Sequence, residues 1–140
     1  MIYKNKFFKV FLVIILLIGF VVAVAVTSIK QQESEAGRIP VSGINVKDPF
    51  VTKIQENKQG DVVFGKNPDF EIIFLPKFEE FLISINGSPF EEKRQKAEEE
   101  LLGKLSISQE EACKLNVRII TPRHINPQES QQDYKLSFCQ

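Results

Sequence analysis

The sequence lacks most of the residue patterns from which reactive sites are built. Its 140 residues contain one His, two Cys and no Trp, and they contain no CxxC, HxxxH or Asp-rich calcium-loop motif. No glycine-rich loop joins a predicted strand to a predicted helix, as phosphate-binding loops require. We therefore predict no catalytic residues, no cofactor-binding residues and no metal ligands, and we expect the protein not to be an enzyme.

The chain also lacks an excess of charge of either sign. It has 18 basic and 18 acidic residues, and without Lys4, Lys6 and Lys9 the remainder has 15 basic and 18 acidic residues. Nucleic-acid-binding proteins usually carry a clustered basic surface, so we expect no nucleic-acid partner. In contrast, the chain has twelve Phe. We expect Phe side chains to dominate the hydrophobic core.

The longest apolar run is Val10–Ile29, VFLVIILLIGFVVAVAVTSI, which contains no charged residue. A helix rises about 1.5 Å per residue, so this run would span the roughly 30 Å of a bilayer's hydrocarbon core. We predict a transmembrane helix at residues 10–29, with the lipid bilayer as its partner. Three lysines precede the run and two basic residues, Lys30 and Arg38, follow it. This small asymmetry predicts a cytoplasmic tail at residues 1–9 and an extracytoplasmic C-terminal domain in the cell membrane.

A cleaved signal peptide is the alternative interpretation of this run. Ala23-Val24-Ala25 fits the small-x-small rule, with cleavage after Ala25. The run is longer than the usual 7 to 15 apolar residues of a signal peptide, and no polar stretch precedes the alanines. We therefore favour a retained, single-pass anchor, and we keep a secreted soluble binding protein as the alternative.

The rest of the chain is long enough for one small domain. Residues 30–43, KQQESEAGRIPVSG, are mostly polar and include Gly and Pro, which predicts a flexible stalk. The domain would then occupy residues 44–140. A weak pattern near its start favours a short helix over residues 49–57, with Asp48 as its N-cap.

Alternating apolar residues predict strands within this domain. In FEIIFLP and EFLISI the apolar side chains fall on both faces, which is typical of inner strands of a covered sheet. The predicted strands cover residues 61–64, 70–75, 80–85, 117–121 and 134–139, with a turn at 65–69 and a polar loop at 122–133.

Two capping boxes predict helices. Ser88-Pro89-Phe90-Glu91 would begin a helix that ends near Leu105, and Ser108-Gln109-Glu110-Glu111 would begin a short helix that ends near Leu115. Charged residues, including Glu98, would form the solvated face of the long helix. Its apolar side would consist of Phe90, Ala97, Leu101, Leu102 and Leu105.

Together these elements predict an α+β fold. An N-terminal transmembrane helix would be followed by a small antiparallel or mixed sheet, packed with one long and one short helix.

The two cysteines, Cys113 and Cys139, enclose 25 residues in the last third of the chain. An even number of cysteines in a small domain outside the cytoplasm first suggests a disulfide. Two free buried thiols are an alternative, because Cys is often a small core residue. A third hypothesis is a thiol enzyme in which His124 is the base that generates a Cys113 thiolate. No motif surrounds either residue, so we favour the disulfide.

The C-terminal half contains FLISINGSPFEEKRQKAEEELLGKLSISQEEACKLNVRIITP, followed by LSFC. In this pattern, residues 44–140 resemble a group of short, uncharacterised membrane-anchored proteins from candidate-phylum bacteria. The resemblance implies a bacterial envelope location and no particular activity. This chain departs from the pattern at Ser106, where Gly is usual, at the expected end of the long helix.

With no catalytic constellation, the domain is expected to bind something. We predict a non-catalytic binding or envelope-interaction module whose partner is a protein or another envelope component. An exposed apolar patch on the domain would strengthen this hypothesis.

Overall fold

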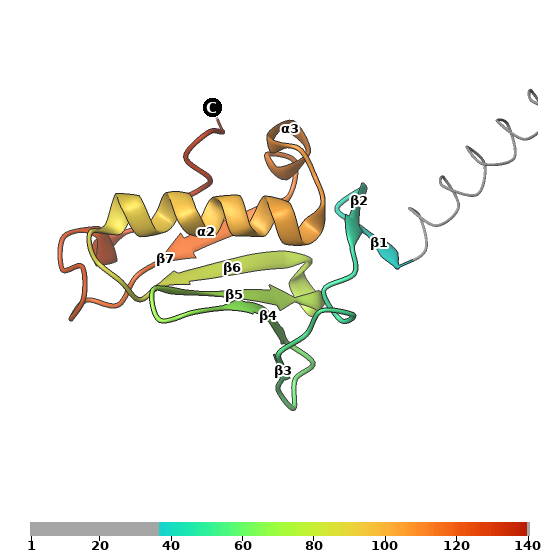
Figure 1. The fold of residues 1–140 in the computed structure, drawn as a ribbon, viewed down its shortest axis with the longest axis horizontal. Coiled ribbons are helices and arrows are strands. Elements are labelled where there is room, and N and C mark those ends of the chain that lie inside the picture. Colours follow the sequence, from blue (N-terminus) through green and yellow to red (C-terminus); the bar gives the residue numbers. More distant parts are fainter. Residues whose placement is uncertain (1–36, 140) are drawn as a thin grey trace, which may run out of the picture. The chain divides into compact units, whose positions relative to one another are not determined.

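The computed structural model describes residues 37–139, which form an α+β unit with two sheets and one long helix (Figure 1). The predicted tail 1–9, transmembrane helix 10–29, cleavage site after Ala25 and stalk residues 30–36 lie outside the described residues. Within the described part, no helix is both long and apolar enough to span a membrane.

Five strands form the main sheet in the order β3-β4-β5-β6-β7. Neighbouring strands are antiparallel except β6 and β7, which are parallel, so the sheet is mixed. A parallel pair needs a crossover connection, and helices α2 and α3 supply it. The strands are β3 (Gln55–Glu56), β4 (Val62–Lys66), β5 (Phe70–Leu75), β6 (Glu80–Ile85) and β7 (Asn116–Ile120).

The hydrophobic core lies between one face of this sheet and α2 (Phe90–Leu105) (Figure 1). Alternate residues of β5 and β6 are buried, as their pattern predicts. Phenylalanine rings pack at the centre of the core: the Phe74 and Phe81 ring centroids are 4.9 Å apart, and those of Phe64 and Phe81 are 5.9 Å apart. Five of the nineteen buried core residues are Phe, against four each of Val, Ile and Leu, so Phe is the most frequent core residue but does not dominate the core.

The long helix ends where it was predicted to end but begins differently. Its N-cap is Pro89, whose extended backbone precedes Phe90, and no side chain caps it. The predicted capping box at Ser88 is therefore wrong. At the other end, Ser106 is the C-cap, with a left-handed backbone at φ 52°. This geometry explains why Gly would suit the position at which this chain has Ser.

The apolar face of α2 is also largely as predicted. Phe90, Ala97, Leu101 and Leu105 are buried, and Leu102 is half-buried. Glu98 is buried as well, so its assignment to the solvated face is wrong.

Helix α3 (Gln109–Ala112) has the predicted capping box. The Ser108 hydroxyl accepts a hydrogen bond from the Glu111 N–H, and the Glu111 carboxylate accepts one from the Ser108 N–H. The helix is shorter than predicted, because residues 113–115 form a turn that leads directly into β7.

The N-terminal part of the unit corrects two predictions. A hairpin of β1 (Arg38–Val41) and β2 (Ile44–Lys47) replaces the end of the predicted stalk, and Val41 and Val46 are buried in the core. The folded unit therefore begins at Gly37 rather than at residue 44. Residues 49–57 are turns followed by β3, not a helix, because the Asp48 carboxylate accepts a bond from the Phe50 N–H within a tight turn.

The C-terminal residues do not form the strand predicted at 134–139. Tyr134 makes a single bridge to Ile119 at the outer edge of β7, and the chain then turns. Leu136 is buried in the core, while the Ser137 N–H donates to the Glu98 carboxylate at 2.8 Å. The Ser137 N–H therefore donates to a side chain of α2. In a strand it would donate to a carbonyl of the neighbouring strand.

Candidate interaction surface

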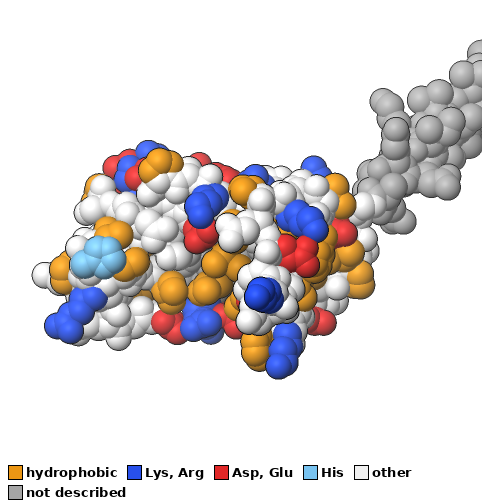
Figure 2. All heavy atoms as spheres, turned by 90° about the horizontal axis from the view of Figure 1, so that it is seen from below, with side chains coloured by type: hydrophobic (Ala, Val, Ile, Leu, Met, Phe, Trp, Pro, Cys, Tyr) orange, Lys and Arg blue, Asp and Glu red, His pale blue; other side chains and the backbone are white. Residues whose placement is uncertain are grey.

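The face of the sheet that points away from α2 carries a row of half-buried apolar side chains. Along β4, β5 and β6, buried residues alternate with half-buried ones, and the half-buried set faces outward. No helix or strand among residues 37–139 covers this face (Figure 1). Figure 2 views the unit from this side and shows hydrophobic side chains between charged ones. We name the apolar part the open face: Val63, Ile73, Leu75, Leu82 and Ile120.

A hollow of about 390 Å³ lies on the open face, lined by Val63, Ile73, Leu75 and Leu82 together with residues of β3 and the turn after it. Hydrogen bonds within the β3–β4 turn hold one wall of the hollow. The Asn57 amide donates to the Asp61 carboxylate at 2.8 Å, and the Asp61 N–H donates back to the Asn57 side-chain oxygen at 2.9 Å.

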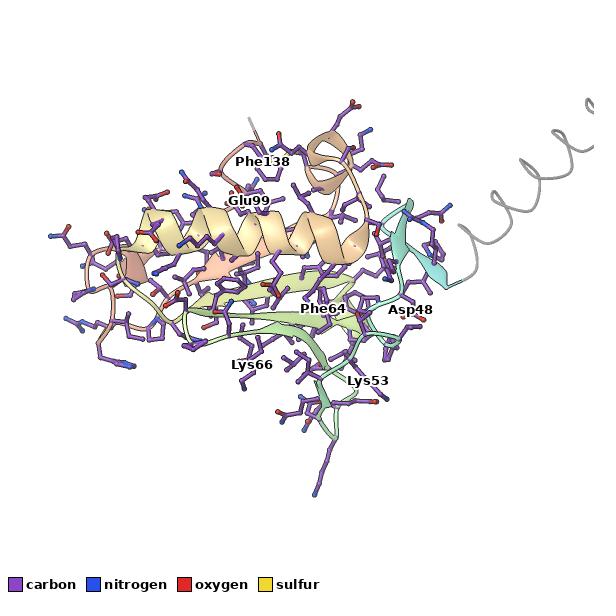
Figure 3. The ribbon with its side chains drawn as sticks, viewed as in Figure 1. Asp48, Lys53, Phe64, Lys66, Glu99 and Phe138 are labelled. Atoms are coloured by element: carbon purple, nitrogen blue, oxygen red, sulfur yellow. A yellow bond between two sulfur atoms is a disulfide. The ribbon has the colours of Figure 1, made fainter. Side chains whose placement is uncertain are left out.

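The charges beside the open face are paired with one another. Lys66 bonds Glu71 at 3.1 Å, and Arg118 bonds Glu80 at 2.6 Å and Asp133 at 3.6 Å. The hydrogen bond that Arg118 donates to the Glu80 carboxylate raises the pKa of Arg118 above its ordinary value. Figure 3 shows Lys66 on this side of the sheet, whereas Glu99 and Phe138 lie on the helical side. Along β4–β7 these charges therefore form ion pairs instead of a field of one sign.

Such a surface is suited to contact with a partner. An apolar centre within a polar rim is the usual composition of a protein–protein contact region. A small hollow in the centre can accept an apolar side chain of the partner. Sequence patterning showed that these strands were apolar on both faces, but it could not show that only one face would be covered.

The two predicted disulfide cysteines are joined. A disulfide links Cys113, directly after α3, to Cys139 near the C-terminus, with their Cα atoms 5.5 Å apart. The disulfide prediction is confirmed, and the alternative of two free thiols does not describe this structure. The bond ties the C-terminal residues to the α2–α3 crossover.

The thiol hypothesis requires a free Cys113 close to His124. Here the sulfur of Cys113 is bonded to Cys139. His124 is exposed and follows the opposite end of β7, whose five residues span about 16 Å. The structure does not bring the two residues together.

A buried polar cluster on α2 was missed at the sequence level. The Arg94 guanidinium donates to the Glu98 carboxylate at 3.0 Å, and the same carboxylate accepts bonds from the N–H and hydroxyl of Ser137. Arg94 also donates to the Lys135 carbonyl at 2.6 Å and lies over the Tyr134 ring. The helical spacing indicates this cluster: Glu98 follows the core residue Ala97 and lies four residues after Arg94, the spacing of an ion pair on a helix. The cluster holds the C-terminal residues on α2.

No group of three or more His, Cys, Asp or Glu residues within residues 37–139 is arranged to hold a metal ion. Comparisons of the chain with protein-family models, with curated proteins and with solved structures found no match. The function is therefore inferred from the sequence and from the surface described above.

Proposed function

We propose that this protein is a single-pass membrane protein whose extracytoplasmic α+β domain binds a protein partner through the open face. The observation that carries the proposal is the uncovered apolar sheet face with its central hollow. Burial of apolar surface is the main driving force for association. Because folding leaves this face half-exposed, a partner that covers it would remove further apolar surface from water.

Two features support the proposed location. The uncharged run Val10–Ile29 has the length and composition of a membrane anchor. The disulfide between Cys113 and Cys139 is typical of proteins in oxidising compartments and rare in the bacterial cytoplasm. Cleavage after Ala25 would instead release the same domain as a soluble binding protein, which is the alternative.

The charges at the rim favour a protein partner of mixed surface composition. Because Lys66 is paired with Glu71, and Arg118 with Glu80, the rim attracts neither polyanions nor polycations strongly. A partner would gain most by placing an apolar side chain in the hollow and polar groups around it.

Site-specific photocrosslinking in native membranes tests the surface. A photoreactive amino acid at position 82, in the hollow, should give one discrete adduct with a protein, while the same group at position 99, on the helical side, should not. Ile73→Lys in the chain with the crosslinker at 82 should abolish the adduct, since it places an uncompensated charge in the contact. Equal adducts from positions 82 and 99 would argue against the open face.

The anchor is tested separately by intact mass and by alkaline carbonate extraction of the membranes. A full-length chain that stays in the carbonate-resistant fraction supports the anchor. A mass beginning at Val26 would show the cleaved, secreted form.

A further inference from the structure

Three large apolar side chains among the described residues are mostly exposed. Val51 is 68%, Phe78 63% and Ile54 57% exposed. Val51 and Ile54 belong to the connection between β2 and β3, and Phe78 ends the 3-10 turn η1 (Pro76–Phe78) between β5 and β6. Neither connection places these side chains in the core.

The two connections lie at the same end of the sheet. Phe50, beside Val51, packs edge-on against Phe74, with ring centroids 6.2 Å apart, and Phe74 directly precedes Leu75 and η1. After Phe78, the Glu79 carboxylate accepts a bond from the Ser42 N–H at 2.9 Å, in the turn of the β1–β2 hairpin. Phe78 therefore directly precedes a residue that contacts the β1–β2 hairpin, and Val51 follows a residue that packs on β5. The Ile54 N–H donates to the Val63 carbonyl of β4 at 2.7 Å.

Lysines lie on both connections and next to the first of them: Lys53 and Lys77 belong to the connections, Lys47 ends β2, and Lys58 lies in the turn after β3. Lys53 pairs with Glu56 at 2.7 Å, whereas Lys47, Lys58 and Lys77 make no ion pair within residues 37–139. The Lys77 ammonium lies 5.8 Å from the centre of the Phe78 ring. Exposed apolar side chains with free lysines beside them are the composition by which proteins bind the interface of an anionic bilayer.

The chain between the apolar run and the folded unit is short enough for this end to reach a membrane. The Gly37 carbonyl accepts a bond from the Asp48 N–H at 2.8 Å, and the Asp48 carbonyl accepts one from the Val51 N–H at 3.2 Å. The apolar run ends at Ile29, so eight residue steps separate it from Gly37. A fully extended chain of that length reaches at most about 28 Å. This step rests on the proposed function, since it takes the run as the anchor.

We propose that Val51, Ile54 and Phe78 insert into the headgroup region of the membrane that anchors the chain, with Lys47, Lys58 and Lys77 contacting anionic headgroups. The insertion removes three large apolar side chains from water and places the three lysines at a negatively charged surface. The side chains of the open face and the inserted side chains belong to different residues. The two surfaces adjoin, because the Ile54 N–H donates to the Val63 carbonyl at 2.7 Å, so a partner and the membrane would contact neighbouring parts of the unit.

The absence of Trp from the chain makes the test direct. The full-length protein carrying Phe78→Trp is reconstituted into vesicles of equimolar phosphatidylcholine and phosphatidylglycerol, with or without bromine on the lipid acyl chains. We expect brominated lipid to quench the fluorescence of the tryptophan at position 78. The matched control, Phe138→Trp on the helical side, should lose no fluorescence. Lys77→Glu in the Phe78→Trp chain should weaken the quenching.

Each outcome separates the two proposals. Equal fluorescence with and without bromine at position 78, in a chain that resists carbonate extraction, would overturn the lipid contact and leave the anchor standing. A blue-shifted but unquenched emission would place position 78 against protein and would also overturn it. Release of the chain by carbonate would instead contradict the anchor.

Discussion

Glu98 shows how one residue can decide the course of a whole segment. Its side chain is 3% exposed and takes bonds from Arg94, one helical turn away, and from Ser137, 39 positions along the chain. A buried carboxylate is tolerated only when its oxygens are paired. Here the pairing also orders the C-terminal residues, which lack strand structure beyond Tyr134.

Replacing Glu98 by Ala should lower the free energy of unfolding by about 3–5 kcal/mol. The change leaves the half-buried Arg94 without its closest anion and leaves the Ser137 N–H without its acceptor. Urea denaturation followed by circular dichroism would measure it. Glu99→Ala, at an exposed neighbouring position, is the matched control and should change stability by less than about 0.5 kcal/mol. Equal effects of the two variants would contradict this role for Glu98.

Ser106→Gly should stabilise the protein by about 0.5–1 kcal/mol. The left-handed backbone at Ser106 costs an L-residue roughly 1–2 kcal/mol, and glycine avoids that cost. Glycine also has more conformational freedom in the unfolded chain, and this offsets part of the gain in stability. Thermal unfolding would detect the gain as a higher Tm. Ser106→Ala keeps the Cβ atom and should give no gain, so a similar gain from both variants would exclude backbone strain as the cause.

At the scale of elements, the two helices begin in different ways. Helix α3 has only four residues, and its capping box satisfies backbone donors that so short a helix could not satisfy otherwise. The hydrogen bond from the Ser108 N–H lowers the pKa of Glu111 below its ordinary value, because it stabilises the ionised carboxylate. Helix α2 has no side-chain cap and depends on its buried face.

Ser108→Ala should therefore cost about 1 kcal/mol of stability, the usual loss for an N-cap serine. Ser88→Ala should cost less than about 0.5 kcal/mol, because Ser88 is exposed and does not cap α2. Chemical denaturation of the two variants side by side would compare them. A larger loss at Ser88 than at Ser108 would show that the capping box predicted for α2 forms after all.

On the scale of the whole molecule, the disulfide joins the end of the chain to the crossover between the parallel strands. Cys113 and Cys139 are 26 positions apart. Closing a loop of that length removes unfolded-chain entropy worth about 3–4 kcal/mol, a large share of the 5–15 kcal/mol typical of a domain.

The double variant Cys113→Ser, Cys139→Ser should accordingly lose about 3–4 kcal/mol of unfolding free energy. Reduction of the unmodified protein should give the same loss, and reductant should not affect the variant. Guanidinium titrations with and without reductant provide the measurement. Unchanged stability of the reduced protein would mean that the bond contributes nothing to the folded unit.

Local patterns predicted the elements whose causes are local. Strands β5 and β6 follow from alternation, α2 from apolar residues at helical spacing, and α3 from its capping box. The residues of the disulfide could also be named, because two cysteines allow one intramolecular bond.

Elements that depend on distant partners were not predictable in this way. Residues 38–43, RIPVSG, contain Pro and Gly as a linker does, but they pair with β2, and Val41 and its hairpin neighbour Val46 are buried in the core. Residues 135–139 alternate like a strand, but Glu98 and Cys113 hold them elsewhere.

Within the described unit, the sequence by itself determined which segments are apolar enough to be buried. The tertiary structure alone decided which apolar faces remain uncovered. The reason is that α2 is one helix and can pack on only one side of the sheet. The outward side chains of β4, β5 and β6 therefore stay half-exposed, and the candidate interaction surface is the face that this helix does not cover.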